Sequence, residues 1–183
     1  MHSKPPLPRR TGALALAAAC AVLLVPATTS LAASGGVGGP GSGSGGPVGK
    51  AKLKNGLAVA PSNAPKRVVR VINAANKIAK GKGYCLGGGH GSWESNCYDC
   101  SGAVSYALRG GDFVKSSMPS GGYMSWGKRG KGKWITIYAN GGHMYAVIAG
   151  LRFDTSMTPG AGPGWSREMR SSSGFKVRHP KNF

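Results

Sequence analysis

The residues of this chain whose types suit covalent chemistry are a cysteine, Cys100, and a histidine, His143. Cys100 stands where the polar stretch 98–99 gives way to residues 103–108, whose apolar members recur at helical spacing. The first turn of a helix offers unpaired backbone N–H groups and the positive end of the helix dipole, and both stabilise a thiolate. The spacing therefore predicts a nucleophilic thiol at the start of a helix.

His143 opens the run 144–149, whose β-branched and aromatic content predicts a buried strand. A cysteine at a helix start that faces a histidine at a strand start is the arrangement that a thiol hydrolase needs, because the imidazole must reach the sulfur. His90 is the competing histidine, because His2 lies in the N-terminal segment that we expect to be removed and His179 lies in a basic C-terminal tail.

Charge limits the partners that such a site would meet. The chain has 183 residues, enough for one compact domain with short extensions, and it carries 24 Lys and Arg against 5 Asp and Glu. The formal net charge of +19 favours a polyanion or an anionic matrix as partner. The sign alone does not choose between nucleic acid, acidic lipid and an anionic cell-wall polymer.

The N-terminus indicates the compartment. Residues 1–33 have the pattern of a secretory signal peptide: basic residues, then the apolar run 13–25, then small residues that end at Ala32 and Ala33. The apolar run is shorter than the ~20 residues that a bilayer-spanning helix needs. We therefore expect cleavage near Ala32 or Ala33, export, and no stable membrane insertion afterwards.

Composition divides the remaining chain into a linker and a domain. Residues 34–65 are rich in Gly, Ser and Pro without a run of large apolar residues, which predicts a flexible linker. Residues 66–183 form the predicted domain. It opens with a helix that starts after Pro65, has one broad apolar face and ends at Gly81.

The cysteines leave three hypotheses open. Once the leader with Cys20 is removed, Cys85, Cys97 and Cys100 remain, an odd number for an exported protein. Pairing Cys85 with Cys97 would leave Cys100 free and would stabilise the fold by ~3 kcal/mol through loop closure. Cys97 and Cys100 could instead form a Cys-x-x-Cys redox pair. Alternatively, these cysteines and His90 form a zinc knuckle, which would point to nucleic acid.

Four short motifs of the chain follow one another in the same order as in one enzyme family. They are Tyr84-x-x-Gly87-Gly88, Asp99-Cys100-Ser101-Gly102, the Pro-Ser-Gly stretch within 118–123, and Gly142-His143. In these motifs the chain resembles, over about residues 66–155, the NlpC-type cell-wall cysteine peptidases. The resemblance implies an α+β, papain-like fold in which the nucleophile helix packs on an antiparallel β-sheet. It also implies hydrolysis of amide bonds in peptidoglycan stem peptides, commonly next to D-glutamate, without metal or cofactor.

The resemblance also implies roles for individual residues. Cys100 would attack the scissile carbonyl, and His143 would hold the thiolate and protonate the leaving amine. The third catalytic residue, which orients the imidazole, falls at Asp154, with Arg152 and Thr155 as the neighbouring alternatives. Because the motif assigns the free thiol to Cys100, it favours the pairing of the other two cysteines of the mature chain.

An oxyanion forms when the thiolate attacks, and the resemblance suggests which groups would bind it. The backbone N–H of Cys100 or Ser101 is expected to donate to it, helped by the Tyr84 hydroxyl.

These patterns predict a secreted or cell-wall-associated cysteine endopeptidase. We expect a monomer that binds stem peptides and anionic cell-wall polymers and no nucleic acid. The alternative is a basic wall-binding module on the same fold with weak or no activity. Two features keep this alternative open: the third catalytic residue is not fixed by the sequence, and the stretch 131–134 is Lys-Gly-Lys-Trp where the family usually has Pro-Gly-Asp, so the acid is lost. Intact Cys100 and His143 favour the enzyme.

Overall fold

The computed structural model describes residues 47–157 and 161–183, so the predicted signal peptide and the first part of the linker lie outside the described residues. Its elements in chain order are β1 (Lys52–Lys54), β2 (Leu57–Val59), α1 (Lys66–Ile78), α2 (Cys100–Gly110), α3 (Ser120–Tyr123), β3 (Lys128–Arg129), β4 (Ile135–Ala139), β5 (Met144–Ile148), β6 (Leu151–Asp154), β7 (Gly164–Ser166) and β8 (Lys176–His179). No helix within the described ranges is long and apolar enough to cross a bilayer.

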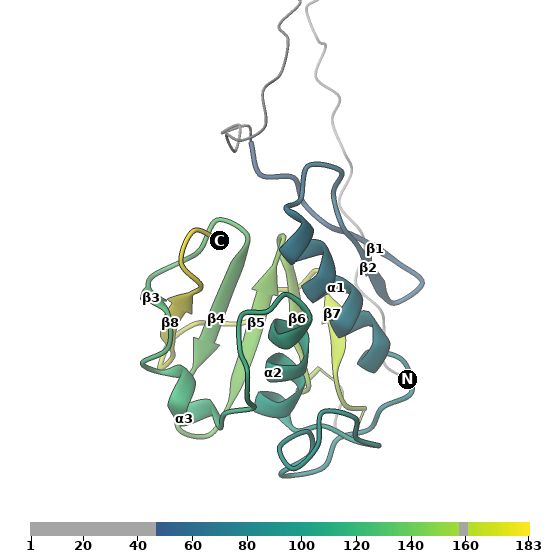
Figure 1. Ribbon diagram of the computed structural model, residues 1–183, viewed down its shortest axis with the longest axis vertical. Coiled ribbons are helices and arrows are strands. Elements are labelled where there is room, and N and C mark those ends of the chain that lie inside the picture. Colours follow the sequence, from purple (N-terminus) through teal and green to yellow (C-terminus); the bar gives the residue numbers. More distant parts are fainter. Residues whose placement is uncertain (1–46, 158–160) are drawn as a thin grey trace, which may run out of the picture. The chain divides into compact units, whose positions relative to one another are not determined.

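The main sheet has six antiparallel strands in the order β3-β8-β4-β5-β6-β7. Helices α1 and α2 lie side by side over one face of this sheet, as Figure 1 shows. The α+β class expected from the sequence is therefore confirmed. Strand β5 lies between β4 and β6. The residue before it, His143, is therefore held at the end of an interior strand of the sheet.

The core fills the space between the two helices and the sheet. Alternate residues of the central strands point toward the helices and are buried, including Ile135, Ile137, Ala146, Ile148, Leu151 and Phe153. Helix α1 contributes Val68 and Ile72 to the same core. This is the amphipathic helix that the apolar spacing predicts, and its polar face points away from the core.

The structure places part of the expected linker inside the domain. Residues 52–59, which the sequence analysis assigns to a flexible segment, form the hairpin β1–β2. Its turn is Asn55-Gly56, both with positive φ, which is the type I′ pair that favours a two-residue hairpin. The hairpin is fixed to α1 because the Asn76 side chain donates to the Ala58 carbonyl and accepts from its N–H. For residues 52–59 the Asn-Gly turn signal therefore predicts the structure better than the Gly- and Pro-rich composition does.

Candidate active site

Cys100 is the first residue of α2, where the sequence pattern places it. Asp99 caps this helix: its Oδ1 accepts a hydrogen bond of 2.7 Å from the Gly102 N–H. Among the described residues, the N–H groups of Cys100 and Ser101 have no hydrogen-bond partner, so they remain free donors beside the sulfur. Cys100 is buried, with 9% of its surface exposed.

Asp99 also ties the glycine-rich loop to the start of α2. Its Oδ2 accepts from the Gly87 N–H at 3.0 Å, and its Oδ1 accepts from the Ser101 hydroxyl at 3.0 Å. His90 Nε2 lies 3.1 Å from Asp99 Oδ1. Burial alone would raise the pKa of the Asp99 carboxyl, but the Gly102 N–H and the His90 ring outweigh it and lower the pKa. The carboxylate is therefore held in its charged form by the groups that position Cys100.

We expect Asp99→Ala to lower the free energy of unfolding by ~1 kcal/mol or more, the usual effect of removing a helix N-cap. The loss would leave the N–H groups of Gly87 and Gly102 without their acceptor. Urea unfolding measures the effect. Asp112→Ala is a suitable control because Asp112 is exposed and pairs with Arg70 on the surface. Equal stability of the Asp99 and Asp112 variants would contradict the prediction.

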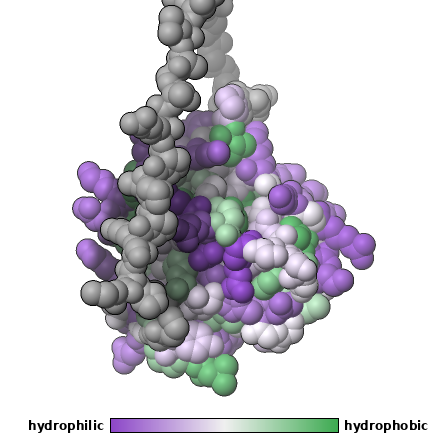
Figure 2. Space-filling model, turned by 180° about the vertical axis from the view of Figure 1, so that it is seen from behind, coloured by the Kyte–Doolittle hydropathy of each residue, from purple (hydrophilic) through white to green (hydrophobic). Residues whose placement is uncertain are grey.

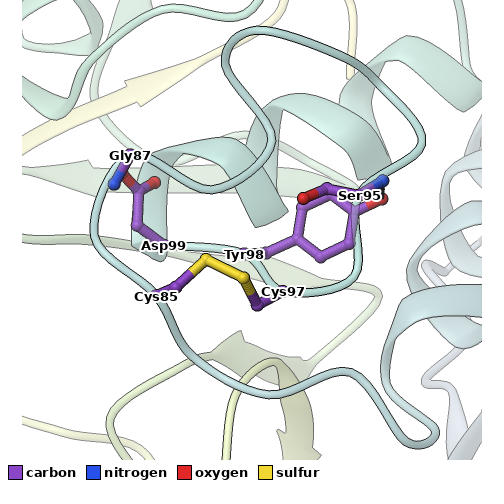
Figure 3. Close-up of a disulfide and its surroundings, with 6 residues drawn as sticks. All are labelled: Cys85, Gly87, Ser95, Cys97, Tyr98 and Asp99. Atoms are coloured by element: carbon purple, nitrogen blue, oxygen red, sulfur yellow. Dashed lines mark hydrogen bonds between the residues drawn. A yellow bond between two sulfur atoms is a disulfide. The ribbon is translucent and has the colours of Figure 1, made fainter.

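A disulfide joins Cys85 to Cys97, and Cys100 is a free cysteine, which confirms the first of the three cysteine hypotheses. The Cys97–Cys100 redox pair is thereby wrong. The zinc knuckle is wrong as well, because a disulfide removes two of its four thiolate and imidazole ligands. Figure 3 shows the bond beside Asp99 and Tyr98.

The disulfide closes a loop that contacts the first turn of α2. Within this loop the Gly88 carbonyl accepts a hydrogen bond of 3.2 Å from the Asp99 N–H. A side chain at Gly102 would collide with the same carbonyl, so only glycine permits this close approach of loop and helix. The glycines of the motif thus allow the loop to lie directly on the segment that carries Cys100.

His143 immediately precedes β5, and the turn between β4 and β5 fixes its backbone. The Asn140 side chain accepts hydrogen bonds from the N–H groups of Gly142 and His143, at 3.0 and 2.8 Å. The His143 carbonyl accepts from the Asn140 N–H at 2.9 Å. On the imidazole, Nε2 lies 3.0 Å from Asp154 Oδ1, and the ring packs edge-on against Phe175 with centroids 6.4 Å apart.

The protonation of His143 follows from its two partners. The hydrogen bond to Asp154 and, after it, the nearby Cys100 side chain raise the pKa of His143 to about 9, although burial opposes the rise. Since Asp154 takes Nε2, Nδ1 is the ring nitrogen that is left for the sulfur. The imidazole is therefore protonated at neutral pH and faces the cysteine on one side and a carboxylate on the other.

Asp154 is the last residue of β6, and its side chain is fully buried. Burial would raise the pKa of this carboxyl, but its interactions with His143, together with hydrogen bonds from the N–H and hydroxyl of Ser156, lower the pKa to about 2. Arg152 Nε and Arg170 Nη1 lie 3.6 and 3.4 Å from Oδ2. Of the three positions considered for the third residue, Asp154 is the one that hydrogen-bonds His143.

The two residues expected at the oxyanion differ in what they offer. Tyr84 is 42% exposed, and the pKa of its phenol is raised by partial burial and by the nearby Cys100 and Asp99. The Ser101 hydroxyl is engaged with Asp99 and His90, so only the backbone N–H of Ser101 is free to donate. His90 belongs to this capping network, and its Nδ1 lies 3.1 Å from the Ser117 hydroxyl.

The sequence analysis did not identify four side chains that support these groups, namely Asn140, Ser156, Arg170 and Phe175. Asn140 had a usable signal, because an Asn that precedes Gly-Gly favours a turn that its own side chain closes. The other three reach the site from loops, and their contacts depend on how the chain folds back over the sheet. No short sequence pattern predicts such contacts.

The cysteine, histidine and aspartate form a chain of interacting groups. A thiol beside an imidazolium that is itself held by a carboxylate is suited to nucleophilic attack followed by protonation of a leaving group. The two free N–H groups at the helix start are suited to stabilise an anionic oxygen. No cluster of metal-ligating side chains occurs among the residues that the structure describes.

Comparison with known proteins gives similarities at the level of solved structures. The chain is similar to the peptidoglycan hydrolase RipB of Mycobacterium tuberculosis (23% identity, 66% of this chain and 68% of that chain, TM-score 0.47). It is similar to the resuscitation-promoting-factor-interacting protein RipA (18% identity, 73% and 70%, TM-score 0.46). It is also similar to the P60 domain of an M. avium subspecies paratuberculosis antigen (20% identity, 62% and 94%, TM-score 0.43). No family model and no curated protein sequence matches the chain.

Proposed function

We propose that this protein is a secreted cell-wall cysteine endopeptidase that hydrolyses amide bonds in peptidoglycan stem peptides. The observation that carries the proposal is the hydrogen bond of 3.0 Å between His143 and the buried carboxylate of Asp154, together with the position of Cys100 at the start of α2, where its thiol raises the pKa of His143. The motif resemblance supplies the substrate class, with the bond next to D-glutamate as the first candidate. The signal-peptide pattern of residues 1–33 supports action outside the cytoplasm.

The reaction begins when the Cys100 thiolate attacks the scissile carbonyl carbon and the carbonyl π electrons move to oxygen. The resulting oxyanion accepts hydrogen bonds from the N–H groups of Cys100 and Ser101, with the exposed Tyr84 hydroxyl nearby. His143 then donates its proton to the amide nitrogen, the C–N bond breaks, and a thioester remains.

Deacylation uses the same groups in reverse. The imidazole of His143, now neutral, removes a proton from water, and the hydroxide attacks the thioester carbonyl through a second oxyanion. The C–S bond breaks and the thiolate returns beside the imidazolium. Asp154 keeps the imidazole oriented throughout, because its hydrogen bond at Nε2 leaves Nδ1 toward the sulfur.

Mass spectrometry of muropeptides, after incubation with the purified mature protein, tests the function. Fragments newly split within the stem peptide support the peptidase. The second candidate is a basic wall-binding module without activity, and the lost acid of residues 131–134 favours it. An unchanged muropeptide profile together with tight sedimentation on walls would establish that module and overturn the peptidase.

We expect the alkaline limb of activity to lie near pH 9 and to move to lower pH in Asp154→Asn. The hydrogen bond to Asp154 is the largest cause of the raised pKa of His143, so its loss lowers the pKa and the imidazolium deprotonates earlier. The pH dependence of kcat/KM measures the limb. Asp112→Asn is the matched control, because it removes a surface carboxylate that pairs with Arg70. Identical limbs in all three proteins would contradict the assignment of Asp154.

The same pair makes stability depend on pH. The pKa of His143 is higher in the folded state than its ordinary 6.5, so its contribution is complete below about pH 6.5 and is lost as the pH rises through about 9. The pKa of Asp154 is lowered from 3.8 to about 2, so its contribution is present above pH 3.8 and is lost as the pH falls toward 2. The loss of stability at high pH and the loss at low pH should therefore both be smaller in Asp154→Asn than in the wild-type protein.

A further inference from the structure

A basic pocket lies at the edge of the sheet formed by β3 and β8. Its volume is about 260 Å³, and its lining consists of Arg129, Phe175, Lys176, Val177 and Arg178. Arg129 and Lys176 are exposed, whereas the two apolar side chains are partly buried. The lining thus combines three cations with an apolar surface, and we call it the Arg129 pocket.

The cations of the Arg129 pocket have no acidic partner. The register of β3 and β8 places Arg129 opposite Arg178 and Lys128 opposite His179. Like charges directly opposite each other in an antiparallel pair destabilise the sheet. The five acidic residues of the chain are Glu94, Asp99, Asp112, Asp154 and Glu168, and among the described residues none of them forms an ion pair with a lining cation. A ligand that carries negative charge would relieve this repulsion.

Arg178 is already held in place within this group. Its Nε donates a hydrogen bond of 2.6 Å to the Met124 carbonyl, which fixes the guanidinium next to the pocket. Its terminal nitrogens have no hydrogen-bond partner among the described residues. Guanidinium groups bind carboxylate and phosphate through paired N–H donors, so their planar geometry favours these anions. A fixed guanidinium loses less entropy on binding than a mobile one.

The Arg129 pocket adjoins the candidate active site through Phe175. This ring lines the pocket and also packs edge-on against His143, with centroids 6.4 Å apart, and against Tyr145, at 5.3 Å. A polymer that places an anionic group in the pocket would therefore run past the catalytic histidine. In Figure 2 the side of the molecule that carries β3 and β8 is on the right, where hydrophilic residues project into solvent.

We propose that the Arg129 pocket binds an anionic group, a carboxylate or a phosphodiester, of the wall polymer whose stem peptide reaches Cys100. The proposal rests on the proposed function for the identity of the polymer. It extends that function because it assigns binding to one site and not to the general positive charge of the surface. The contact between Phe175 and His143 favours the hydrolysed polymer over nucleic acid as the occupant.

Sedimentation with isolated cell walls at 0.1 M salt tests the site, with Cys100→Ala as the background so that no substrate is consumed. In this background Arg129→Gln/Lys176→Gln should weaken wall binding at least ~10-fold, as expected when charge-assisted hydrogen bonds are lost. The matched control, Lys66→Gln/Lys80→Gln, removes the same charge from two exposed lysines at α1, outside the pocket. It should weaken binding less than ~2-fold.

Chemical treatment of the walls identifies the anion. If the group is a phosphodiester, the difference between the two double variants disappears on walls stripped with hydrofluoric acid. If it is a carboxylate, the difference persists there and disappears on walls whose carboxylates are amidated. Equal weakening by both double variants would overturn the site in favour of diffuse charge. Stronger competition by single-stranded DNA than by the soluble wall polymer would overturn the choice of occupant.

Binding and cleavage are measured separately, so the two proposals can fail independently. If the wild-type protein does not cleave stem peptides but the two double variants still differ in wall binding, the peptidase is rejected and the anion site is retained. Melting temperatures check the fold, and Arg129→Gln should not lower them, because it removes a like-charge pair with Arg178. If the double variant fails to fold, Arg129→Gln alone should still weaken binding more than Lys66→Gln does, and equal binding would overturn the site.

Discussion

Replacing Cys100 with alanine is expected to abolish cleavage of peptidoglycan stem peptides while wall binding stays unchanged. The sulfur is the atom that would form the bond to the substrate carbonyl, and no other free cysteine occurs among the described residues. Alanine leaves α2, its Asp99 cap and the basic surface intact, so only the chemistry is removed. Mass spectrometry of the muropeptides measures cleavage, and sedimentation with isolated walls measures binding.

The control for this substitution is an exposed serine outside the candidate active site. Ser125, whose hydroxyl makes a single long contact with the Gly122 carbonyl, is exposed, and Ser125→Ala should retain full cleavage. Cys100→Ser separates nucleophile strength from shape, because it keeps a polar atom at the same position but lacks the reactivity of a thiolate. Cleavage by the alanine variant at a measurable fraction of the wild-type rate would contradict the proposed mechanism.

Removal of the Cys85–Cys97 disulfide is expected to cause the largest loss of stability and a loss of activity with it. The two cysteines are 12 residues apart, and closing a loop of this size contributes ~3 kcal/mol in the chain-entropy estimate. The loop also supplies the Gly88 carbonyl and the Gly87 N–H, both of which bind Asp99. A double substitution to alanine should therefore loosen the segment that places Cys100. Urea unfolding and the cleavage rate measure the two effects.

Reductant provides the control for the disulfide. The wild-type protein in dithiothreitol should unfold at the same urea concentration as the Cys85→Ala/Cys97→Ala variant, and dithiothreitol should not affect the variant further. Labelling of thiols without reductant should modify Cys100 alone in the mature chain. An unchanged unfolding midpoint in the double variant would show that the loop is held by its other contacts, such as the hydrogen bonds to Asp99.

Local patterns predicted those elements whose signals lie within a few residues of each other. Helix α1 follows from its apolar face and Pro65, and α2 begins at Cys100, where the polar stretch changes to a helical pattern. Strand β5 follows from the apolar run after His143. In each case the spacing of apolar residues predicts the type of element, because burial of one helix face or one strand is the dominant local contribution to folding.

The prediction of a flexible linker from composition was wrong where a local turn signal and a tertiary contact act together. The hairpin of residues 52–59 lies in a stretch with the composition of a linker, and Asn76 on α1 holds it in place. A second long-range contact to Asn76 comes from Trp165, which lies on β7, is buried, and donates a hydrogen bond to the Asn76 side chain. Both contacts join segments that are distant in the chain.

By itself, the sequence determined the helix start at Cys100, the odd number of cysteines and the basic charge, because residue type and spacing are properties of the chain alone. Only the tertiary structure decided which of the neighbours Arg152, Asp154 and Thr155 meets His143, because the pairing of β5 with β6 brings Asp154, at the end of β6, beside the start of β5, where its Oδ1 lies 3.0 Å from Nε2 of His143. The antiparallel register likewise decided that Arg129 lies opposite Arg178, because strand pairing brings together side chains that no local pattern connects.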